Sequence, residues 1–231
     1  MNVLRITARM SVEIASREQV HLDAILMAQS PDCPKGRLTR FSPLSEIRNP
    51  PIPIADLDFE GHRVPLCSSW IFDGDARAGL QHIVRRKDPI DVHHRAQTWT
   101  PSSGPEKNYM IPLPTVLAPT VTWICIGDPS RMPAALSRVR QIGTVRRHGY
   151  GVVLGWDVEE ADDHPPGRVL VSPDGRAMRF LPAAWCTWAE SLEYGAVQPP
   201  YWHPDLRVPR VRPGVRCTLR EDILERVARC H

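Results

Sequence analysis

The sequence contains no long apolar run and very little lysine. No stretch approaches the roughly 18 consecutive apolar residues of a membrane-spanning helix, so we expect no membrane partner. The opening residues alternate apolar and polar side chains instead of forming an apolar block, which predicts a cytoplasmic protein without a signal peptide. Only three of the 29 lysine and arginine residues are lysines, and the formal net charge is +3. A GC-rich genome produces the same bias, so only the placement of the arginines can indicate a function.

Paired cysteines and enzyme motifs are also missing. The six cysteines are scattered and form no CxxC pair, which disfavours both a zinc site and a disulfide framework. His93 and His94 are adjacent, and adjacent histidines rarely converge on one ion, so we expect no metal and no cofactor. The nucleophile motif GxSxG and the zinc-protease motif HExxH are absent. These absences predict a protein that is not an enzyme.

The apolar periodicity predicts an α+β fold. Alternating residues indicate strands and residues at helical spacing indicate helices, in the order strand 3–14, helix 20–29, strand 62–72, strand 120–127, a helix after Asp128 and strand 151–160. Residues 73–116 look irregular and polar and are too long for an ordinary turn, so we interpret them as a functional insertion. The order matches the βαββαβ unit of ferredoxin-like folds, the architecture of RNA-recognition modules.

Capping signals set the expected helix ends. Asp128 stands where an N-cap belongs and Pro129 follows it, while Gly143 has the place of a C-terminal glycine. Thr218 and Glu221 form a capping-box pattern before a last amphipathic helix. We therefore assign residues 1–160 to the core and 161–231 to a C-terminal extension packed on it.

A glycine-rich loop lies inside a stretch that has no acidic residue. Between Asp128 and Asp157 the side chains that carry or can take up positive charge are Arg131, Arg138, Arg140, Arg146, Arg147 and His148. Soluble surfaces usually mix charges, so this field predicts the binding of a polyanion.

Gly149, Tyr150 and Gly151 complete this predicted site. The two glycines remove side chains, so their backbone N–H groups would face a phosphate directly. We then expect alanine at either glycine to cost more RNA affinity than stability. The alternative is a tight turn that needs glycine for its positive φ, with the arginines simply solvated.

Two further segments are basic. The insertion carries a patch next to Trp99 that suits a nucleic-acid strand, formed by Arg85, Arg86, Lys87, His93, His94 and Arg95. A solvated loop explains the same residues. Residues 207–216 predict an extended basic arm or an edge strand blunted by charge.

One catalytic hypothesis remains. RNA cleavage without a metal could use His148 as the general base and Arg146 or Arg147 to stabilise charge. No second acid or base stands at a fixed position nearby, so we expect no cleavage.

At this point the motifs resemble a known family. "IGTVRRHGYGVVLGWDVEE" (142–160) resembles the glycine-rich loop and final strand of the RAMP superfamily of CRISPR proteins, and "TVTWICIGDPSRMPAALSRV" (120–139) is similar to the strand and helix before that loop. "LRITARM" and "HLDAIL" are similar to the opening strand and helix of the type IV CRISPR effector subunit that corresponds to the subunit binding the 5′ handle of the CRISPR RNA (crRNA) in other systems.

The resemblance implies a non-catalytic subunit of an effector ribonucleoprotein. Such a subunit caps the crRNA 5′ handle, contacts the first backbone subunit of the filament and meets target DNA only indirectly. It also implies that residues 73–116 form a thumb-like insertion near the handle. Two alternatives stay open: a metal-independent endoribonuclease of the same superfamily that processes crRNA, and a scaffold that binds proteins without RNA.

Overall fold

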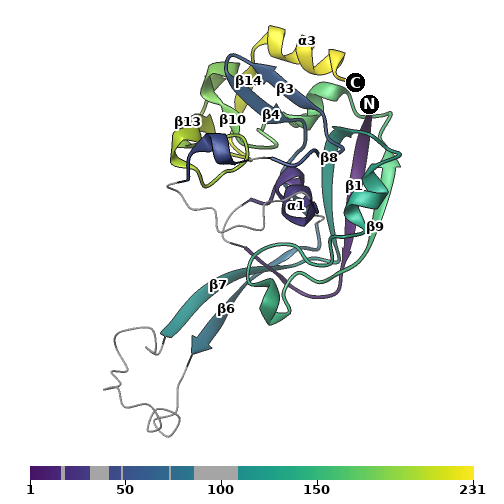
Figure 1. Cartoon of the computed structure of the whole chain (residues 1–231), viewed down its shortest axis with the longest axis vertical. Coiled ribbons are helices and arrows are strands. Elements are labelled where there is room, and N and C mark those ends of the chain that lie inside the picture. The colour runs from purple at the N-terminus through teal and green to yellow at the C-terminus, as the bar shows by residue number, and fades with distance from the viewer. Residues whose placement is uncertain (17–18, 32–41, 48, 73, 86–108) are drawn as a thin grey trace, which may run out of the picture.

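A computed structural model describes residues 1–16, 19–31, 42–47, 49–72, 74–85 and 109–231 of the chain (Figure 1). The fold is α+β, as the periodicity predicts, and its strand pairs are antiparallel. The α-helices of the described residues are α1 (Leu22–Gln29), α2 (Met132–Leu136) and α3 (Glu221–Arg229). None of the helices in this part of the chain is long and apolar enough to span a membrane.

The main sheet has the strand order β5-β8-β1-β9. Its members are β1 (Asn2–Met10), β5 (Ile71–Phe72), β8 (Thr120–Gly127) and β9 (Val153–Glu160). The strand predicted at 120–127 is confirmed at both ends. The single strand predicted at 62–72 is wrong, because the chain forms β4 (His62–Pro65), leaves the ladder and forms β5 only at its end.

One face of this sheet is covered by both helices of the core. Leu4, Ile6 and Ala8 alternate along β1 and are buried in one cluster with residues of α1 and α2. Ile6 lies opposite Trp123 of β8, which is fully buried in the same cluster. The core therefore lies between the sheet and the two helices, and both helices are positioned by that one apolar face.

Helix α2 is shorter than predicted. The Asp128 carboxylate accepts hydrogen bonds from the N–H groups of Ser130 and Arg131, at 2.9 and 3.3 Å, so it caps a turn that precedes the helix. The helix itself begins at Met132 and ends at Leu136. Gly143 is therefore not its C-terminal cap, because residues 137–142 follow in a non-helical path that still buries Val139 and Ile142.

The insertion begins and ends in regular structure. Strands β6 (Arg77–Arg85) and β7 (Tyr109–Leu117) pair over nine residues, and β2 (Ile14–Ala15) joins the far side of β7. This hairpin extends away from the body of the molecule (Figure 1). The expectation of irregular structure is wrong here: Pro112 and Pro114 argue against a strand, but both lie beyond the two residues of β7 that are in register with β2.

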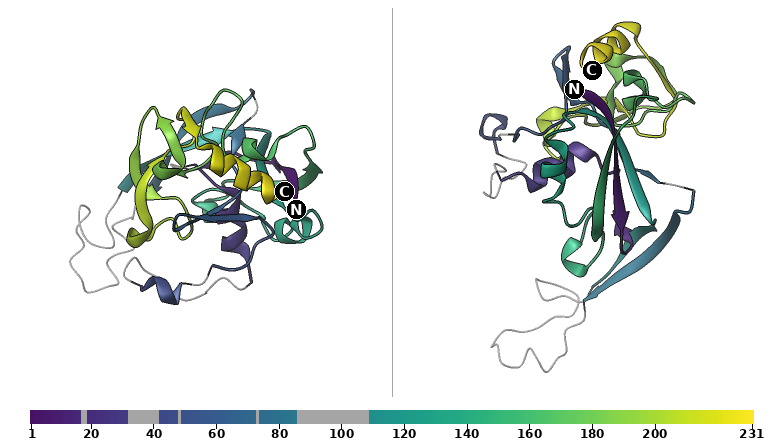
Figure 2. Two further views of the ribbon diagram at one scale, coloured as in Figure 1. Left: turned by 90° about the horizontal axis from the view of Figure 1, so that it is seen from above. Right: turned by 90° about the vertical axis from the view of Figure 1, so that its right-hand side faces the viewer.

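The C-terminal extension packs on the other end of the sheet (Figure 2). It forms the sheet β10-β13-β12 and the pair β11-β14, with the bounds β10 Leu181–Pro182, β11 Cys186–Ala189, β12 Glu193–Ala196, β13 Arg207–Val211 and β14 Cys217–Leu219. Val3 and Ile126 of the main sheet share a buried cluster with Trp185 and Ile223 of the extension. Strand β13 is the middle strand of its sheet, so the prediction of a basic arm or edge strand at 207–216 is wrong.

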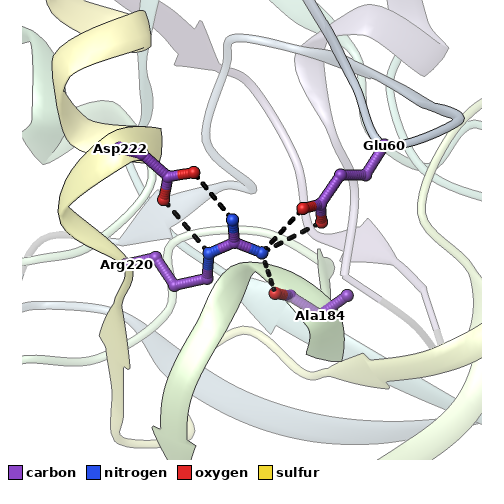
Figure 3. Close-up of polar contacts among 4 residues, drawn as sticks. All are labelled: Glu60, Ala184, Arg220 and Asp222. Carbon is purple, nitrogen blue, oxygen red and sulfur yellow. Dashed lines mark hydrogen bonds and ion pairs between the residues drawn. The ribbon is translucent and has the colours of Figure 1, made fainter.

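Helix α3 is anchored by Arg220 and not by a capping box. The Arg220 guanidinium binds the Asp222 carboxylate with two hydrogen bonds, of 3.1 and 2.7 Å, and reaches Glu60 of the hairpin of β3 (Asp56–Phe59) and β4 at 2.8 Å (Figure 3). It also donates to the Ala184 carbonyl oxygen. Arg220 is itself the N-cap residue, without a side-chain cap bond, while Thr218 lies in β14. The capping-box prediction is therefore wrong.

Candidate nucleic-acid interface

The glycine-rich loop, residues 141–152, connects the end of the α2 segment to β9. It contains a single 3₁₀ turn at Arg146–His148, and the residue before this turn, Val145, has left-handed backbone geometry with φ 55°. A β-branched residue rarely adopts this conformation, because its Cβ crowds the backbone. The loop therefore holds strained backbone directly beside the adjacent arginines Arg146 and Arg147.

Two glycines of the loop are required by packing within the chain. A Cβ atom on Gly151 would lie 1.9 Å from the carbonyl oxygen of Ile142, and one on Gly143 would lie 2.5 Å from that of Ala15. At Gly149 a Cβ atom would meet nothing within 4 Å, although its φ is +88°. Gly143 and Gly151 thus serve close backbone approach inside the protein, whereas Gly149 serves only the shape of the turn.

The predicted phosphate donors of the loop are already occupied. The Gly149 N–H group donates to the Arg146 carbonyl oxygen at 2.9 Å, and the Gly151 N–H group donates to that of Glu13 at 2.8 Å. The hypothesis that these two groups face a phosphate is therefore wrong. Both bonds close the turn that sequence reasoning treated as an open cradle.

Other N–H groups of the same loop have no acceptor among the described residues. They belong to Val145, Arg146 and Arg147, the three residues at which left-handed geometry passes into the 3₁₀ turn. Successive N–H groups at such a change of hand point into one concavity that suits an anion. The loop thus offers free donors, shifted toward its N-terminal side from the predicted positions.

The arginines of the acid-free stretch are exposed and unpaired. We call Arg131, Arg138, Arg140, Arg146 and Arg147 the unpaired arginines, because none of them forms an ion pair with a carboxylate of the described residues.

Several exposed arginines elsewhere in the chain form ion pairs, whereas Arg77, Arg207 and Arg216 form none with a described carboxylate. Arg63 binds Asp56 at 2.7 Å and Arg176 binds Asp174 at 2.8 Å, although all four side chains reach the surface. Exposure alone therefore does not explain the difference between the two groups. The acid-free stretch keeps its positive charge because no described carboxylate forms an ion pair with its arginine side chains.

Three of the unpaired arginines border hollows on two sides of α1. Arg131 and Arg138 line one of about 430 Å³ between α1, residues 51–53 and α2. Arg146 lines a second of about 280 Å³ between α1 and the glycine-rich loop. Positive charge therefore stands at the edges of concave surface, where a chain of phosphates and bases could lie.

His148 is not held in a catalytic arrangement. Its side chain is exposed at the end of the 3₁₀ turn, and it has no hydrogen-bond partner among the described residues. A general base is normally oriented by a second group.

Tyr150, the aromatic residue between the two glycines, is half-buried.

The predicted patch of the insertion falls almost wholly outside the described residues. Arg85 is the last residue of β6 and pairs with Tyr109 across the hairpin. The remaining members of that patch lie outside the described residues, namely Arg86, Lys87, His93, His94 and Arg95.

The face of the main sheet opposite the helices is apolar at one end, where the C-terminal extension covers Val3, Ile124 and Ile126, and polar beyond it. Arg9 binds Asp157 of β9 at 3.2 Å, and the hydroxyl groups of Thr7 and Thr122 lie 3.3 Å apart. The sheet's tryptophans, Trp123 and Trp156, lie on the helix side. RNA-recognition modules instead stack bases on aromatic side chains of the open sheet face, so this surface lacks that device.

Sequence reasoning missed a buried polar cluster next to the second hollow. The Tyr201 hydroxyl donates to Asp23 at 2.6 Å and accepts from Arg179 at 2.8 Å. Cys67 donates to the other oxygen of Asp23 at 3.3 Å, and burial raises the pKa of its thiol well above the ordinary value. His21 stacks on Tyr201, with ring centroids 5.3 Å apart. No spacing in the sequence marks these residues, because they come from separate segments.

Metal ligands are not gathered in the described residues: no group of three His, Cys, Asp or Glu side chains lies together there.

Comparison with protein families gives the decisive observation on identity. The family CRISPR type IV associated protein Csf3 matches residues 68–212, which is more than half of the chain. The chain belongs to the Csf3 family. It is therefore a type IV CRISPR-associated protein, as the motifs of the loop and the N-terminus predict. No curated protein matches the chain.

The Csf3 match includes the parts that form the candidate interface. It covers β8, α2, the glycine-rich loop and β9, and with them all of the unpaired arginines. It also covers the insertion. The residues of β1 and α1, which pack beneath the loop, precede the matched region.

Proposed function

We propose that this Csf3-family chain is a non-catalytic RNA-binding subunit of a type IV CRISPR effector, and that it caps the 5′ handle of the crRNA. The observation that carries the proposal is that the unpaired arginines have no described carboxylate partner, in a chain of a type IV CRISPR family. A free guanidinium keeps its forked donors available for phosphate. A polyanion neutralises such a cluster and releases its own counterions.

The backbone of the loop supports the same assignment. The N–H groups of Val145, Arg146 and Arg147 have no described acceptor and belong to the turn from which two of the unpaired side chains extend, and successive N–H groups in such a turn suit an anion. Backbone and side-chain donors then bind the same stretch of phosphates.

The arrangement of the core supports a RAMP-type, ferredoxin-like fold. Strands β1, β5, β8 and β9 correspond to the first, second, third and fourth strands of a βαββαβ unit, with α1 after β1 and α2 after β8. Their order in the sheet, β5-β8-β1-β9, is then second-third-first-fourth, as in that unit. The open sheet face carries paired charges and no stacking platform. We therefore place the RNA at the loop and beside α1, and not across the sheet.

The projecting hairpin supports contacts with neighbouring subunits. It exposes several large apolar side chains, namely Leu80, Val84, Met110 and Leu117. Several exposed apolar side chains on one element mark an interaction surface more often than a single exposed apolar side chain does. In this account the hairpin contacts the backbone subunits of the effector, and target DNA is met through the RNA.

One experiment separates this function from its alternatives. The purified chain is mixed with labelled RNA of its CRISPR repeat in the presence of EDTA, and both complex formation and RNA length are followed. The proposal expects a complex with full-length RNA. Cleavage without metal would instead establish the endoribonuclease, and the absence of both would establish a scaffold that does not bind RNA. The His148→Ala variant should bind the RNA as the wild type does. If the wild type cleaves the RNA, this variant should have lost the cleavage.

A further inference from the structure

A small pocket lies between α1, the glycine-rich loop and the C-terminal extension. It has a volume of about 280 Å³. Pockets for drug-sized ligands span roughly 300–1,000 Å³, so this one suits a single small ring system. Its walls combine apolar, aromatic and polar side chains, among them Ala24, Ile25, Phe180, Tyr201, Gln141 and Arg146.

His21 forms part of the wall and is the unexplained residue of the pocket. Its side chain is only 2% exposed, yet neither ring nitrogen has a hydrogen-bond partner among the described residues. Burial lowers the pKa of His21 well below 6.5, and the charges of Arg179 and Arg210 act in the same direction. The ring is therefore neutral at physiological pH and has one donor and one acceptor unused. Buried polar groups without partners are uncommon and call for an explanation.

The surroundings of His21 favour a planar, polar ring as the missing partner. Phe180 meets the imidazole edge to face at 4.9 Å, and Tyr201 stacks on it at 5.3 Å, so the site already orders flat groups. The Gln141 amide donates to the Arg146 carbonyl oxygen at 3.0 Å, which leaves its own oxygen without a described partner. Arg146, one of the unpaired arginines, stands at the same pocket.

From this juxtaposition we infer that the pocket takes one unstacked nucleobase of the bound RNA, with the adjoining phosphate at Arg146. The inference rests on the proposed RNA-binding function and adds where one base is held. Proteins that bind single-stranded RNA splay out bases, stack them on aromatic rings and hydrogen-bond their edges. His21 and Gln141 supply the hydrogen-bonding groups, and Phe180 and Tyr201 supply the rings.

The test compares the effect of filling the pocket with a larger side chain and the effect of removing one base from the RNA. A series of repeat RNAs, each with one abasic position, is titrated against the full chain. A base held on aromatic side chains contributes a roughly 5- to 150-fold gain in affinity. One abasic position should therefore weaken binding by that factor, while abasic sites at neighbouring positions should not. The variant Ala24→Leu fills the pocket from α1. It should bind intact RNA as weakly as the wild type binds that abasic RNA. Removing the base should then weaken the binding of the variant no further.

Matched variants keep the result interpretable. Ala28→Leu fills the same pocket from an exposed position of α1, so it serves if Ala24→Leu lowers the melting temperature. Ala134→Leu makes the same change on α2, in the other hollow, and should keep the wild-type sensitivity to the abasic position. If RNA binds but no abasic position is coupled to the pocket variants, the inference is overturned and the RNA-binding function stands. If the wild type does not bind RNA, both fall together.

Discussion

The Tyr201 hydroxyl donates a 2.6 Å hydrogen bond to the Asp23 carboxyl group, across 178 positions of the chain. Asp23 is fully buried in α1, and Tyr201 belongs to the C-terminal extension. Arg179, which is also fully buried, donates to the same hydroxyl and to carbonyl oxygens of Pro65, Cys67 and Val197. One polar cluster thus joins the helix beneath the candidate interface to the segment that closes the pocket beside it.

We predict that Tyr201→Phe destabilises the protein by about 1–3 kcal/mol, because it leaves a buried acceptor and a buried donor without their partner. Tyr194→Phe is the matched control, since that ring is 64% exposed and a surface change of this kind stays within about 0.5 kcal/mol. Urea unfolding of the two variants beside the wild type measures both effects. Equal midpoints for the two variants would show that the cluster contributes nothing to stability.

Stability should also depend on pH through His21. Burial lowers its pKa in the folded protein well below 6.5, so on acidification the unfolded chain takes up a proton before the folded chain does. Stability contributed by the neutral ring is therefore complete above pH 6.5 and is lost as the pH falls from there toward the folded pKa, by up to about 1.4 kcal/mol per pH unit. His21→Phe removes this dependence while keeping a flat ring.

Urea unfolding at about pH 7.5 and about pH 5.5 measures this dependence. The wild type should lose more stability between the two than His21→Phe does. An equal loss in both proteins would mean that His21 takes up its proton in the folded state as readily as in the unfolded state.

The two glycines that flank Tyr150 should respond differently to alanine. At Gly149 the new methyl group meets open space, so the cost is only that of left-handed backbone, about 1–2 kcal/mol, and RNA affinity is kept. At Gly151 it would lie 1.9 Å from the Ile142 carbonyl oxygen, so the backbone must move and the loss should be clearly larger. Thermal melting of the two variants tests this order. The reverse order would contradict this packing account, and a selective loss of RNA affinity in folded Gly149→Ala would restore the phosphate-cradle hypothesis.

Local patterns predicted some elements to within a residue or two. The strand Thr120–Gly127 was found at both ends, because its β-branched and aromatic residues are bounded by proline on one side and by Gly-Asp-Pro on the other. Strand β9 was predicted two residues too early, since Gly151 and Val152 are apolar but still belong to the loop.

Other features depend on contacts that no local pattern contains. Arginine is expected at the surface, and Arg179 is buried only because carbonyl oxygens and a hydroxyl from distant segments satisfy it. The loop shows the same limit. Its glycines and arginines could be identified as a site, but the acceptor of the Gly151 N–H group is Glu13, which pairing of the N-terminal segment brings there.

The central claim is that the arginines without a carboxylate partner bind the phosphates of RNA, and two double variants isolate it. Arg146→Ala with Arg147→Ala removes two unpaired arginines of the loop. Arg63→Ala with Arg176→Ala removes two arginines that form ion pairs at 2.7 and 2.8 Å. Each pair lowers the formal net charge by the same two units, so any difference comes from position and not from overall charge.

The most direct measurement is the affinity of the three proteins for repeat RNA over a range of salt concentrations. Each lost phosphate contact reduces the slope of log affinity against log salt by roughly 0.7–0.9. We predict a slope lower by about 1.4–1.8 for the loop variant, with weaker binding at low salt, and an unchanged slope for the variant of the paired arginines. Equal slopes for the two double variants, both folded, would contradict the account.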